Sequence, residues 1–337
     1  MPVKIAVLMP ESPVRASFIP PAVMRGLEEV GEVTYNSAGY ETQNIAGLLR
    51  EADICVTGWG CPVLGGEILA QADRLRMAAH TGGSVAPIVS RELYDRGIVV
   101  VSGNELYAQS VAEGCITYML AALREIPRYN SIVQNGGWRQ GGFVNKGLLG
   151  RKVGLVGLGA VSRNLIPMLA AFGCRVVVHC EYASDEELER LNTTRAQSLE
   201  ELFSSCDIVS LHLARTRETY HTVGKKLLGL MPDGALLVNT ARGSVVNERE
   251  LAEILAAGRI HAVLDVFEEE PLPADSPLKG LENVILIPHM AGPTADRREK
   301  VTLALIEDMK RFLAGKPLKH AIDMEYAMRM TDDTLKL

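Results

Sequence analysis

Residues 153–162 read Val-Gly-Leu-Val-Gly-Leu-Gly-Ala-Val-Ser and predict a strand, a tight turn and the start of a helix. An apolar run meets a Gly-x-Gly turn, and a helical pattern opens directly after it. Gly157 and Gly159 fit the first two glycines of the dinucleotide fingerprint, in which the backbone turns sharply and lets a pyrophosphate approach. The backbone N–H groups that follow, beginning with Ala160 and Val161, would then receive the phosphates at a helix N-terminus.

Two further positions bear on this motif. Glu181 lies 22 residues after Gly159, behind a second predicted strand at 175–180. An acidic side chain at that place can bind ribose hydroxyls. Ser162 stands at the third position of the fingerprint, where it adds one hydroxymethyl group to a site of close packing. An ordinary glycine-rich turn is the alternative, but the strand–helix context favours a Rossmann domain with NAD as its cofactor.

The composition indicates a globular protein of two domains. The chain has 337 residues, and about 150 residues per domain is typical. A net charge of −6 without a Lys/Arg block argues against a nucleic-acid partner. The six cysteines form no CxxC pair, so we expect reduced core residues and no bound metal. No apolar run approaches the ~18 residues of a membrane span, and a cytoplasmic location without membrane contact is expected.

Short apolar runs alternate with helical patterns along the whole chain. This alternation implies parallel sheets that are covered by helices on both faces, and therefore two doubly wound α/β domains. One long helical pattern covers 105–127, and another covers 298–313. The predicted strands are 4–9, 53–57, 76–80, 98–102, 153–157, 175–180, 208–212, 235–239, 261–266 and 284–288.

Four polar residues follow predicted strands at the end where open α/β sheets bind ligands, namely Arg242, Asp265, Glu270 and His289. An arginine can hold a carboxylate through two parallel hydrogen bonds. A histidine is the usual proton donor near neutral pH, and a neighbouring carboxylate raises its pKa. Taken singly, each could be a helix cap, a surface charge or a residue at a loop edge. Together, beside a dinucleotide site, they indicate a reaction centre.

These segments resemble the D-isomer-specific 2-hydroxyacid dehydrogenase family. The similar stretches are 57–60, 110–113, 238–248, 264–273 and 288–292. The resemblance implies that Arg242 binds the substrate carboxylate and the reacting oxygen, and that His289 is the general acid/base with Glu270 as its partner. It further implies that the cofactor is lined by Thr240, Ala241, Asp265 and His289.

The resemblance also implies an architecture and a reaction. Residues 1–104 with 293–337 would form a flavodoxin-like substrate domain, residues 105–292 the Rossmann NAD-binding domain, and a cleft would separate them. The reaction would be the reversible, NAD-dependent reduction of a small-molecule 2-keto acid to an (R)-2-hydroxy acid, in a homodimer. Backbone N–H groups at Thr81, Gly82 and Gly83 would hold the carboxylate of the substrate.

Several positions depart from the family pattern. Ser84 stands where an aspartate is common, Cys180 stands at the usual acid position one residue before Glu181, and Gly114 replaces a frequent histidine. Two other functions stay open: an NAD(H)-sensing binding protein like the corepressors of this fold, and a formate dehydrogenase. The Arg/Glu/His set favours a hydroxyacid dehydrogenase over both, but the sequence does not name the hydroxy acid.

Overall fold

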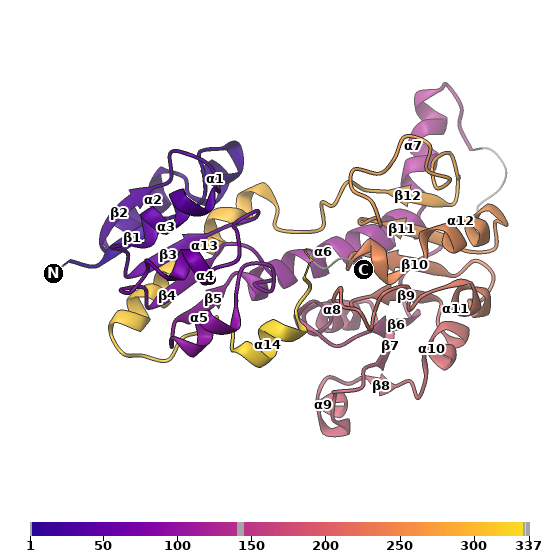
Figure 1. Ribbon diagram of the computed structural model, residues 1–337. Coiled ribbons are helices and arrows are strands. Elements are labelled where there is room, and N and C mark those ends of the chain that lie inside the picture. The colour runs from indigo at the N-terminus through magenta and orange to yellow at the C-terminus, as the bar shows by residue number, and fades with distance from the viewer. Residues whose placement is uncertain (1, 140–144, 333, 335–337) are drawn as a thin grey trace. The chain divides into compact units, whose positions relative to one another are not determined.

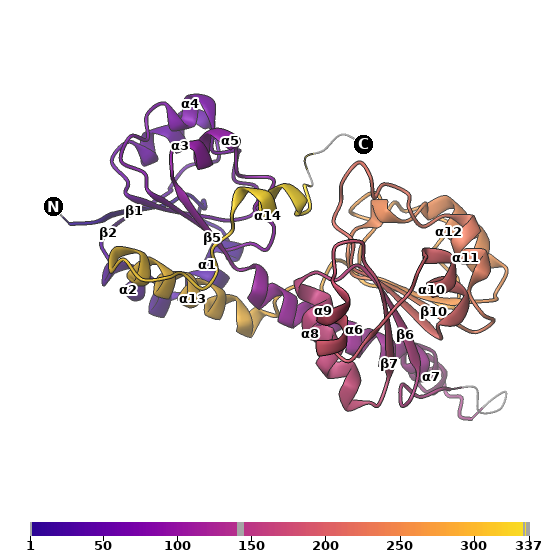
Figure 2. The same cartoon turned by 90° about the horizontal axis from the view of Figure 1, so that it is seen from below.

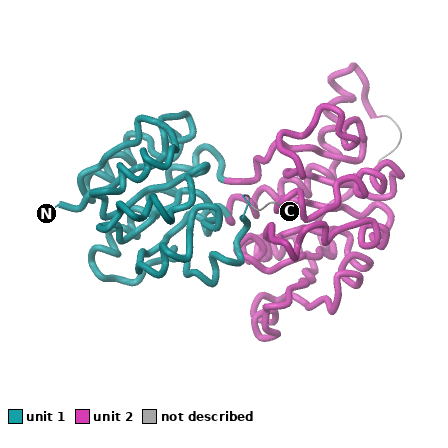
Figure 3. The backbone as a smooth tube through the Cα atoms, viewed as in Figure 1, with its two compact units in different colours: residues 1–107, 293–336 teal, residues 108–292, 337 magenta. Residues whose placement is uncertain are grey.

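A computed structural model describes residues 2–139, 145–332 and 334, and it shows two compact α/β units (Figure 1). Unit 1 consists of Met1–Tyr107 with Pro293–Lys336, and unit 2 contains Ala108–Gly292 (Figure 3). Unit 2 is therefore inserted into the chain of unit 1. Each unit has its own sheet and its own hydrophobic core on both sheet faces.

Unit 1 is built on a five-stranded, wholly parallel sheet in the order β2-β1-β3-β4-β5. This is the strand order of flavodoxin-like domains, the domain type that the family resemblance implied. Its strands are β1 Lys4–Val7, β2 Glu32–Tyr35, β3 Ile54–Thr57, β4 Met77–His80 and β5 Val99–Ser102. The strands β3 and β4 are buried along their whole length, as expected for strands covered by helices on both faces.

Helices cover both faces of this sheet (Figure 2). One core lies between the sheet and α1, α2 and α13, and the other lies on the side of α3, α4 and α5. The C-terminal segment supplies α13 and α14 to this unit. The helices are α1 Pro13–Phe18, α2 Pro21–Glu28, α3 Thr42–Leu49, α4 Gly66–Leu69, α5 Arg91–Asp95, α13 Ala295–Leu313 and α14 Met324–Arg329.

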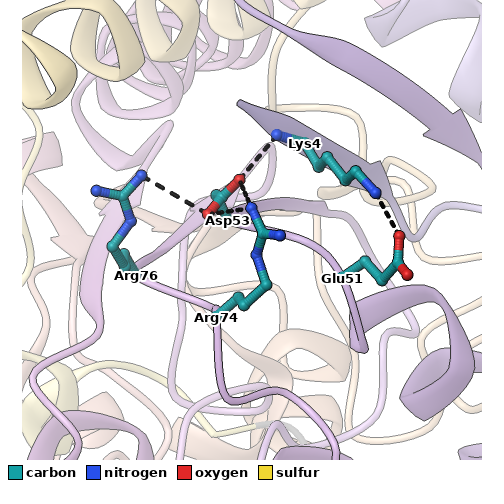
Figure 4. Close-up of polar contacts among 5 residues, drawn as sticks. All are labelled: Lys4, Glu51, Asp53, Arg74 and Arg76. Carbon is teal, nitrogen blue, oxygen red and sulfur yellow. Dashed lines mark hydrogen bonds and ion pairs between the residues drawn. The ribbon is translucent and has the colours of Figure 1, made fainter. Parts of the chain in front are cut away.

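A charged cluster ties the amino ends of three strands of unit 1 together (Figure 4). The carboxylate of Asp53 accepts a hydrogen bond of 2.9 Å from the Lys4 backbone N–H and pairs with Arg74 at 3.0 Å and Arg76 at 3.8 Å. The Lys4 ammonium pairs with Glu51. These residues lie at the amino ends of β1, β3 and β4. The loops that follow the strands lie at the opposite, carboxyl ends of the strands.

Unit 2 is built on a seven-stranded parallel sheet in the order β12-β11-β10-β9-β6-β7-β8. The order reverses between β6 and β9, and ligands bind at such a switch point in doubly wound folds. The strands are β6 Lys152–Val156, β7 Arg175–His179, β8 Thr194–Arg195, β9 Ile208–Leu211, β10 Leu236–Asn239, β11 His261–Leu264 and β12 Val284–Leu286.

The helices of unit 2 also form two layers. One core lies on the side of α6, α8 and α9, and the other on the side of α10, α11 and α12. The helix α6 begins in unit 1 and continues into unit 2. The helices are α6 Asn104–Leu123, α7 Ile126–Gln134, α8 Ala160–Ala171, α9 Asp185–Arg190, α10 Leu199–Ser205, α11 Lys225–Leu230 and α12 Glu248–Ala256, with a short 3₁₀ turn, η1, at Gly243–Val245.

The structure confirms two parallel-sheet α/β domains and corrects some elements. The predicted helix at 105–127 is two helices, because Glu125 has a left-handed backbone with φ 52° and the next helix starts at Ile126, with Pro127 in its first turn. The strands β2 and β8 were missed. No helix in the described part of the chain is long and apolar enough to cross a membrane. All six cysteines are free thiols, and four of them are buried.

Candidate active site

The glycine turn after β6 has the backbone that a dinucleotide site requires. Gly157 has φ 99°, and a Cβ added there would lie 2.9 Å from the carbonyl oxygen of His212. Only glycine fits this close approach without strain. Gly159 caps α8 without a side-chain cap, and a Cβ added there would meet open space. The first N–H groups of α8, at Ala160 and Val161, lie at a helix N-terminus that leaves such donors without intrahelical partners.

Ser162 completes this turn in a way that the sequence did not reveal. Its side chain is buried, and its hydroxyl donates a 2.8 Å hydrogen bond to the carbonyl oxygen of Gly157. This hydrogen bond connects the first turn of α8 to the glycine loop. The left-handed glycine, the open space at Gly159 and the uncapped helix N-terminus together fit the pyrophosphate of a dinucleotide.

The end of β7 carries the residues that would face the adenosine part of such a ligand. Glu181 is exposed there. The two nearby arginines are already occupied: Arg163 pairs with Glu187, and Arg195 pairs with Asp185 at 2.8 Å. Asp185 and Glu187 are thus the ion-pair partners of these two arginines, and Glu187 also pairs with Arg190 at 3.8 Å.

Arg242 follows β10 on a turn that Asn239 shapes. The Asn239 amide donates to the carbonyl oxygen of Arg242 at 3.0 Å and accepts from the Ala241 N–H at 3.1 Å. A Cβ added at Gly243 would lie 1.8 Å from the carbonyl carbon of Phe267. Only glycine lets the segment after β10 touch the segment after β11. This contact brings the backbone of Arg242 next to the segment that carries Glu270.

His289 and Glu270 form a hydrogen-bonded pair. The Nδ1 atom of His289 lies 2.7 Å from Oε2 of Glu270, and both side chains are partly exposed. The other carboxylate oxygen of Glu270 accepts a 3.1 Å hydrogen bond from the Phe267 N–H. His289 itself has a left-handed backbone, with φ 53°, and its N–H donates to the carbonyl oxygen of Asp265 at 2.8 Å. The pair is thus fixed from both sides, and no hydrogen bond within the described residues engages Nε2 of His289.

The protonation of the pair follows from its surroundings. The hydrogen bond to Glu270 raises the pKa of His289, against the opposing effects of burial and of the positive charge of Arg242. Burial pushes the pKa of Glu270 upward, but the hydrogen bonds from His289 and Phe267 and the charge of Arg242 outweigh it and hold that pKa below its usual value. The arrangement therefore favours a protonated imidazole beside an ionised carboxylate. The positive charge of Arg242 contributes to both pKa shifts, so Arg242 lies within electrostatic range of the pair.

Asp265 is the internal support of this site. It is 1% exposed, and its carboxylate accepts hydrogen bonds from the N–H groups of Met290 at 2.7 Å and Ala291 at 3.0 Å and from the hydroxyl of Tyr118 at 3.1 Å. Burial raises the pKa of Asp265, and these hydrogen bonds counteract the rise. The sequence predicted Asp265 beside the cofactor but gave no sign of these three partners. Asp265 therefore fixes the loop that starts at His289.

Two other residues face the same part of unit 2. The hydroxyl of Thr240, which the sequence placed on the cofactor, lies 3.2 Å from the buried thiol of Cys115 on α6. Gly114, the preceding residue, packs on the loop after His289, because a Cβ added there would lie 3.4 Å from the Cα atom of Ala291. The helix α6 thus contacts the segments after β10 and β12, which the sequence did not indicate.

The loop after β4 in unit 1 was expected to offer the backbone N–H groups of Thr81, Gly82 and Gly83 to the substrate, and Thr81 does not fit this expectation. Both the N–H and the hydroxyl of Thr81 donate to the carbonyl oxygen of Thr57, at 2.9 and 3.0 Å, so Thr81 has no free donor for a substrate. No hydrogen bond within the described residues engages the N–H groups of Gly82 and Gly83. A Cβ added at Gly82 would lie 2.2 Å from Nε2 of His80, so this position requires glycine.

The neighbours of this loop hold its shape. His80 is buried and bonded to the hydroxyl of Thr57 at 2.9 Å, and burial lowers its pKa to about 4, so it is neutral at physiological pH. The hydroxyl of Ser84 donates to the carbonyl oxygen of Thr331 in the C-terminal segment. The serine that replaces the family's aspartate therefore connects the loop to the end of the chain.

Residues 116–291 match the family model described as "D-isomer specific 2-hydroxyacid dehydrogenase, NAD binding domain". The chain belongs to this family. The match lies within unit 2 and includes the glycine turn, Arg242, Glu270 and His289. Unit 2 is thus an NAD-binding domain of the D-2-hydroxyacid dehydrogenases.

Relatives within the family differ in what their names say they act on. The chain is 32% identical over 299 residues to D-3-phosphoglycerate dehydrogenase of Methanocaldococcus jannaschii, covering 88% of this chain and 56% of that protein. It is 30% identical over 280 residues to hydroxypyruvate reductase of Thermotoga maritima, covering 82% and 90%. A solved phosphoglycerate oxidoreductase from Rhizobium etli superimposes with a TM-score of 0.80 at 27% identity, covering 96% and 98%. The chain spans about half the length of the first of these relatives.

Proposed function

We propose that this D-2-hydroxyacid dehydrogenase family member reduces a 2-keto acid reversibly to an (R)-2-hydroxy acid with NADH. The observation that carries the proposal is the 2.7 Å bond between His289 and Glu270, next to Arg242, in an NAD-binding domain. A histidine held protonated by a carboxylate is suited to deliver a proton to a carbonyl oxygen that becomes a hydroxyl.

The bound nicotinamide would supply or accept the hydride, and the protein would supply position and charge. His289 would donate its Nε2 proton to the reacting oxygen, while Glu270 keeps the imidazole charged and oriented. Arg242 would hold the substrate carboxylate and the reacting oxygen by parallel hydrogen bonds. The free N–H groups of Gly82 and Gly83 would bind the same carboxylate, and unit 1 would be the substrate domain.

A screen of NADH oxidation tests this proposal. Purified protein is mixed with NADH and glyoxylate, hydroxypyruvate, pyruvate or bulkier 2-keto acids, and the product is resolved on a chiral column. We expect NADH oxidation with at least one keto acid and an (R)-configured product. NADH binding without turnover of any keto acid would favour a sensing protein, and NAD reduction by formate alone would favour a formate dehydrogenase.

The surroundings of Glu181 support a preference for NADH over NADPH. A carboxylate there can accept hydrogen bonds from both ribose hydroxyls and would repel a 2′-phosphate, and Arg163 and Arg195 are paired with acids. The kcat/KM for NADH should exceed that for NADPH, and Glu181→Ala should narrow the difference. Equal efficiency of the wild type with both cofactors would refute the charge argument.

We also propose that the protein is a homodimer. Unit 2 exposes large apolar side chains around α7 and the segments after it, namely Ile126, Val133, Trp138 and Leu149. Exposed apolar side chains gathered in one part of a chain are typical of protein–protein contacts.

A further inference from the structure

Unit 1 contains a cluster of three aromatic rings and one arginine, formed by Phe18, Trp59, Tyr107 and Arg298. Trp59 meets Phe18 edge to face at 5.4 Å and Tyr107 edge to face at 6.1 Å between ring centroids. The Arg298 guanidinium lies 5.6 Å from the centroid of Phe18 and 5.7 Å from that of Trp59. Phe18 is buried, whereas 47% of Trp59 is exposed, so the cluster has a buried floor and an accessible side.

Within the described residues, the guanidinium of Arg298 has no carboxylate partner. Its guanidinium donates to two neutral oxygens, the Ser17 hydroxyl at 3.2 Å and the Pro293 carbonyl at 3.4 Å. No carboxylate of the described residues lies within the 4.0 Å ion-pair distance of it. In the same unit, Arg76 stacks on Phe312 in a similar way but has Asp53 as its counter-charge. A partly buried guanidinium that stacks on aromatic rings and lacks an anion is suited to bind one.

The hydroxyl of Tyr107 also lacks a partner. It is a buried polar atom with no hydrogen bond within the part of the chain that the structure describes. Burial raises the pKa of Tyr107, and the positive charge of Arg298 acts in the opposite direction, so the hydroxyl stays protonated and lies within the field of the guanidinium. Buried hydroxyls in native structures are normally satisfied, and an unsatisfied one beside a cation indicates a missing acceptor.

The cluster adjoins the loop that would hold the substrate carboxylate. A Cβ added at Gly83 would lie 3.5 Å from Cδ1 of Tyr107, so the Tyr107 ring packs directly on this loop. Trp59 follows β3, and Thr57 at the end of β3 holds Thr81 through its carbonyl oxygen. The Tyr107 ring thus links the loop with Gly82 and Gly83 to Trp59.

We propose that Arg298 and the Tyr107 hydroxyl bind an oxyanion on the side chain of the 2-keto acid, with Trp59 as the apolar wall beside it. The inference rests on the proposed function and adds a substrate class to it: 2-keto acids with a second anionic group at the end distant from the keto carbon. A carboxylate and a phosphate share this chemistry, since both accept charge-assisted hydrogen bonds from a guanidinium and a hydroxyl.

Matched substrate pairs test the inference and separate the two sources. 2-Ketoglutarate is compared with 2-ketopentanoate for a carboxylate, and phosphohydroxypyruvate with hydroxypyruvate for a phosphate. We expect one anionic member to exceed its neutral partner by about 10–100-fold in kcat/KM, mostly through KM, as is typical of a hydrogen bond to a charged group. Arg298→Met should remove this preference while keeping turnover of the neutral substrates, and Tyr107→Phe should reduce it.

The control is Arg76→Met, which removes the other arginine stacked on an aromatic ring and should leave the preference unchanged. Equal kcat/KM within both pairs, or a preference that survives in Arg298→Met, would overturn the inference while the proposed function stands. If no keto acid is reduced, the proposed function is wrong. The binding of the anionic keto acid, measured without turnover, then tests the inference about Arg298. In a Trp138→Phe background, Trp59 is the remaining tryptophan, and its fluorescence should change with the anionic keto acid but not in Arg298→Met. No change would overturn the inference.

Discussion

At the level of single residues, the carboxylate of Glu270 sets the protonation of His289. Because the bond to Glu270 raises the pKa of His289, the imidazole stays protonated to higher pH. Keto acid reduction needs the protonated form, so its activity is present below this pKa and lost as the pH rises through it. Glu270→Gln lowers the pKa of His289, and the alkaline limb of kcat/KM against pH should move to lower pH.

A matched variant separates this effect from a general change of charge. Glu268 lies on the same segment and also contacts a histidine, His221, at 2.9 Å. Glu268→Gln should leave the position of the alkaline limb unchanged. Identical pH profiles for wild type and Glu270→Gln would show that the carboxylate does not control the proton donor.

Arg242 should be sensitive to the shape of its side chain as well as to its charge. Arg242→Lys keeps the positive charge but loses the planar fork that can hold a carboxylate and the reacting oxygen together. The loss of one charge-assisted hydrogen bond predicts a fall in kcat/KM on the order of 10–100-fold. Steady-state kinetics with the best keto acid measure this, and full activity of the lysine variant would contradict two-point binding.

The sequence predicted the site residues that follow strands but not the hydrogen bonds that hold them. Arg242, Glu270 and His289 were singled out as candidates because the carboxyl ends of parallel strands lie at the same end of a sheet. The three partners of Asp265 and the bonds that occupy Thr81 depend on how loops distant in sequence approach one another. No local pattern encodes such contacts. The hydrogen bond from Ser162 to Gly157 was not predicted either, although the sequence showed that a serine occupies the third position of the fingerprint.

At the level of secondary-structure elements, Asp265 connects the loop after β12 to β11 and α6. It directly follows β11, binds the N–H groups of that loop, and accepts a hydrogen bond from Tyr118 on α6. Asp265→Asn keeps the volume but offers one acceptor oxygen where two backbone N–H groups now bind. One buried donor then loses its partner, which costs about 1–3 kcal/mol in the free energy of unfolding. Urea denaturation measures this. Tyr118→Phe, which removes only the hydroxyl bond, should cost less, and wild-type stability of Asp265→Asn would contradict the proposed support.

The elements that the sequence missed share a physical cause. The central strands are continuous apolar runs because both of their faces are buried, and all were predicted to within a few residues. The strands β2 and β8 each lie at one edge of their sheet and lack such a run, whereas β5 and β12 at the other edges have one and were predicted. The helical pattern at 105–127 hid a break, because periodicity does not register the left-handed backbone of a single residue such as Glu125.

For the molecule as a whole, the proposed homodimer predicts a mass in solution of about twice the 36.6 kDa of one chain. Light scattering coupled to size-exclusion chromatography measures it. Replacing the exposed Trp138 and Val133 by serine should weaken the association if the apolar surface of unit 2 forms the contact. A monomer at all concentrations would contradict the proposal, and a dimer that both substitutions leave intact would place the contact elsewhere.

If His289 is the proton donor of an NADH-dependent 2-keto acid reductase, loss of its side chain must remove most of the turnover without weakening the binding of NADH. Wild type and His289→Ala are compared by kcat with the best keto acid and by NADH affinity from fluorescence titration. We predict that kcat falls by about 10²–10⁴-fold, the usual contribution of general acid/base catalysis, while NADH affinity is retained. A correctly folded His289→Ala protein with the kcat of the wild type would show that His289 is not the proton donor.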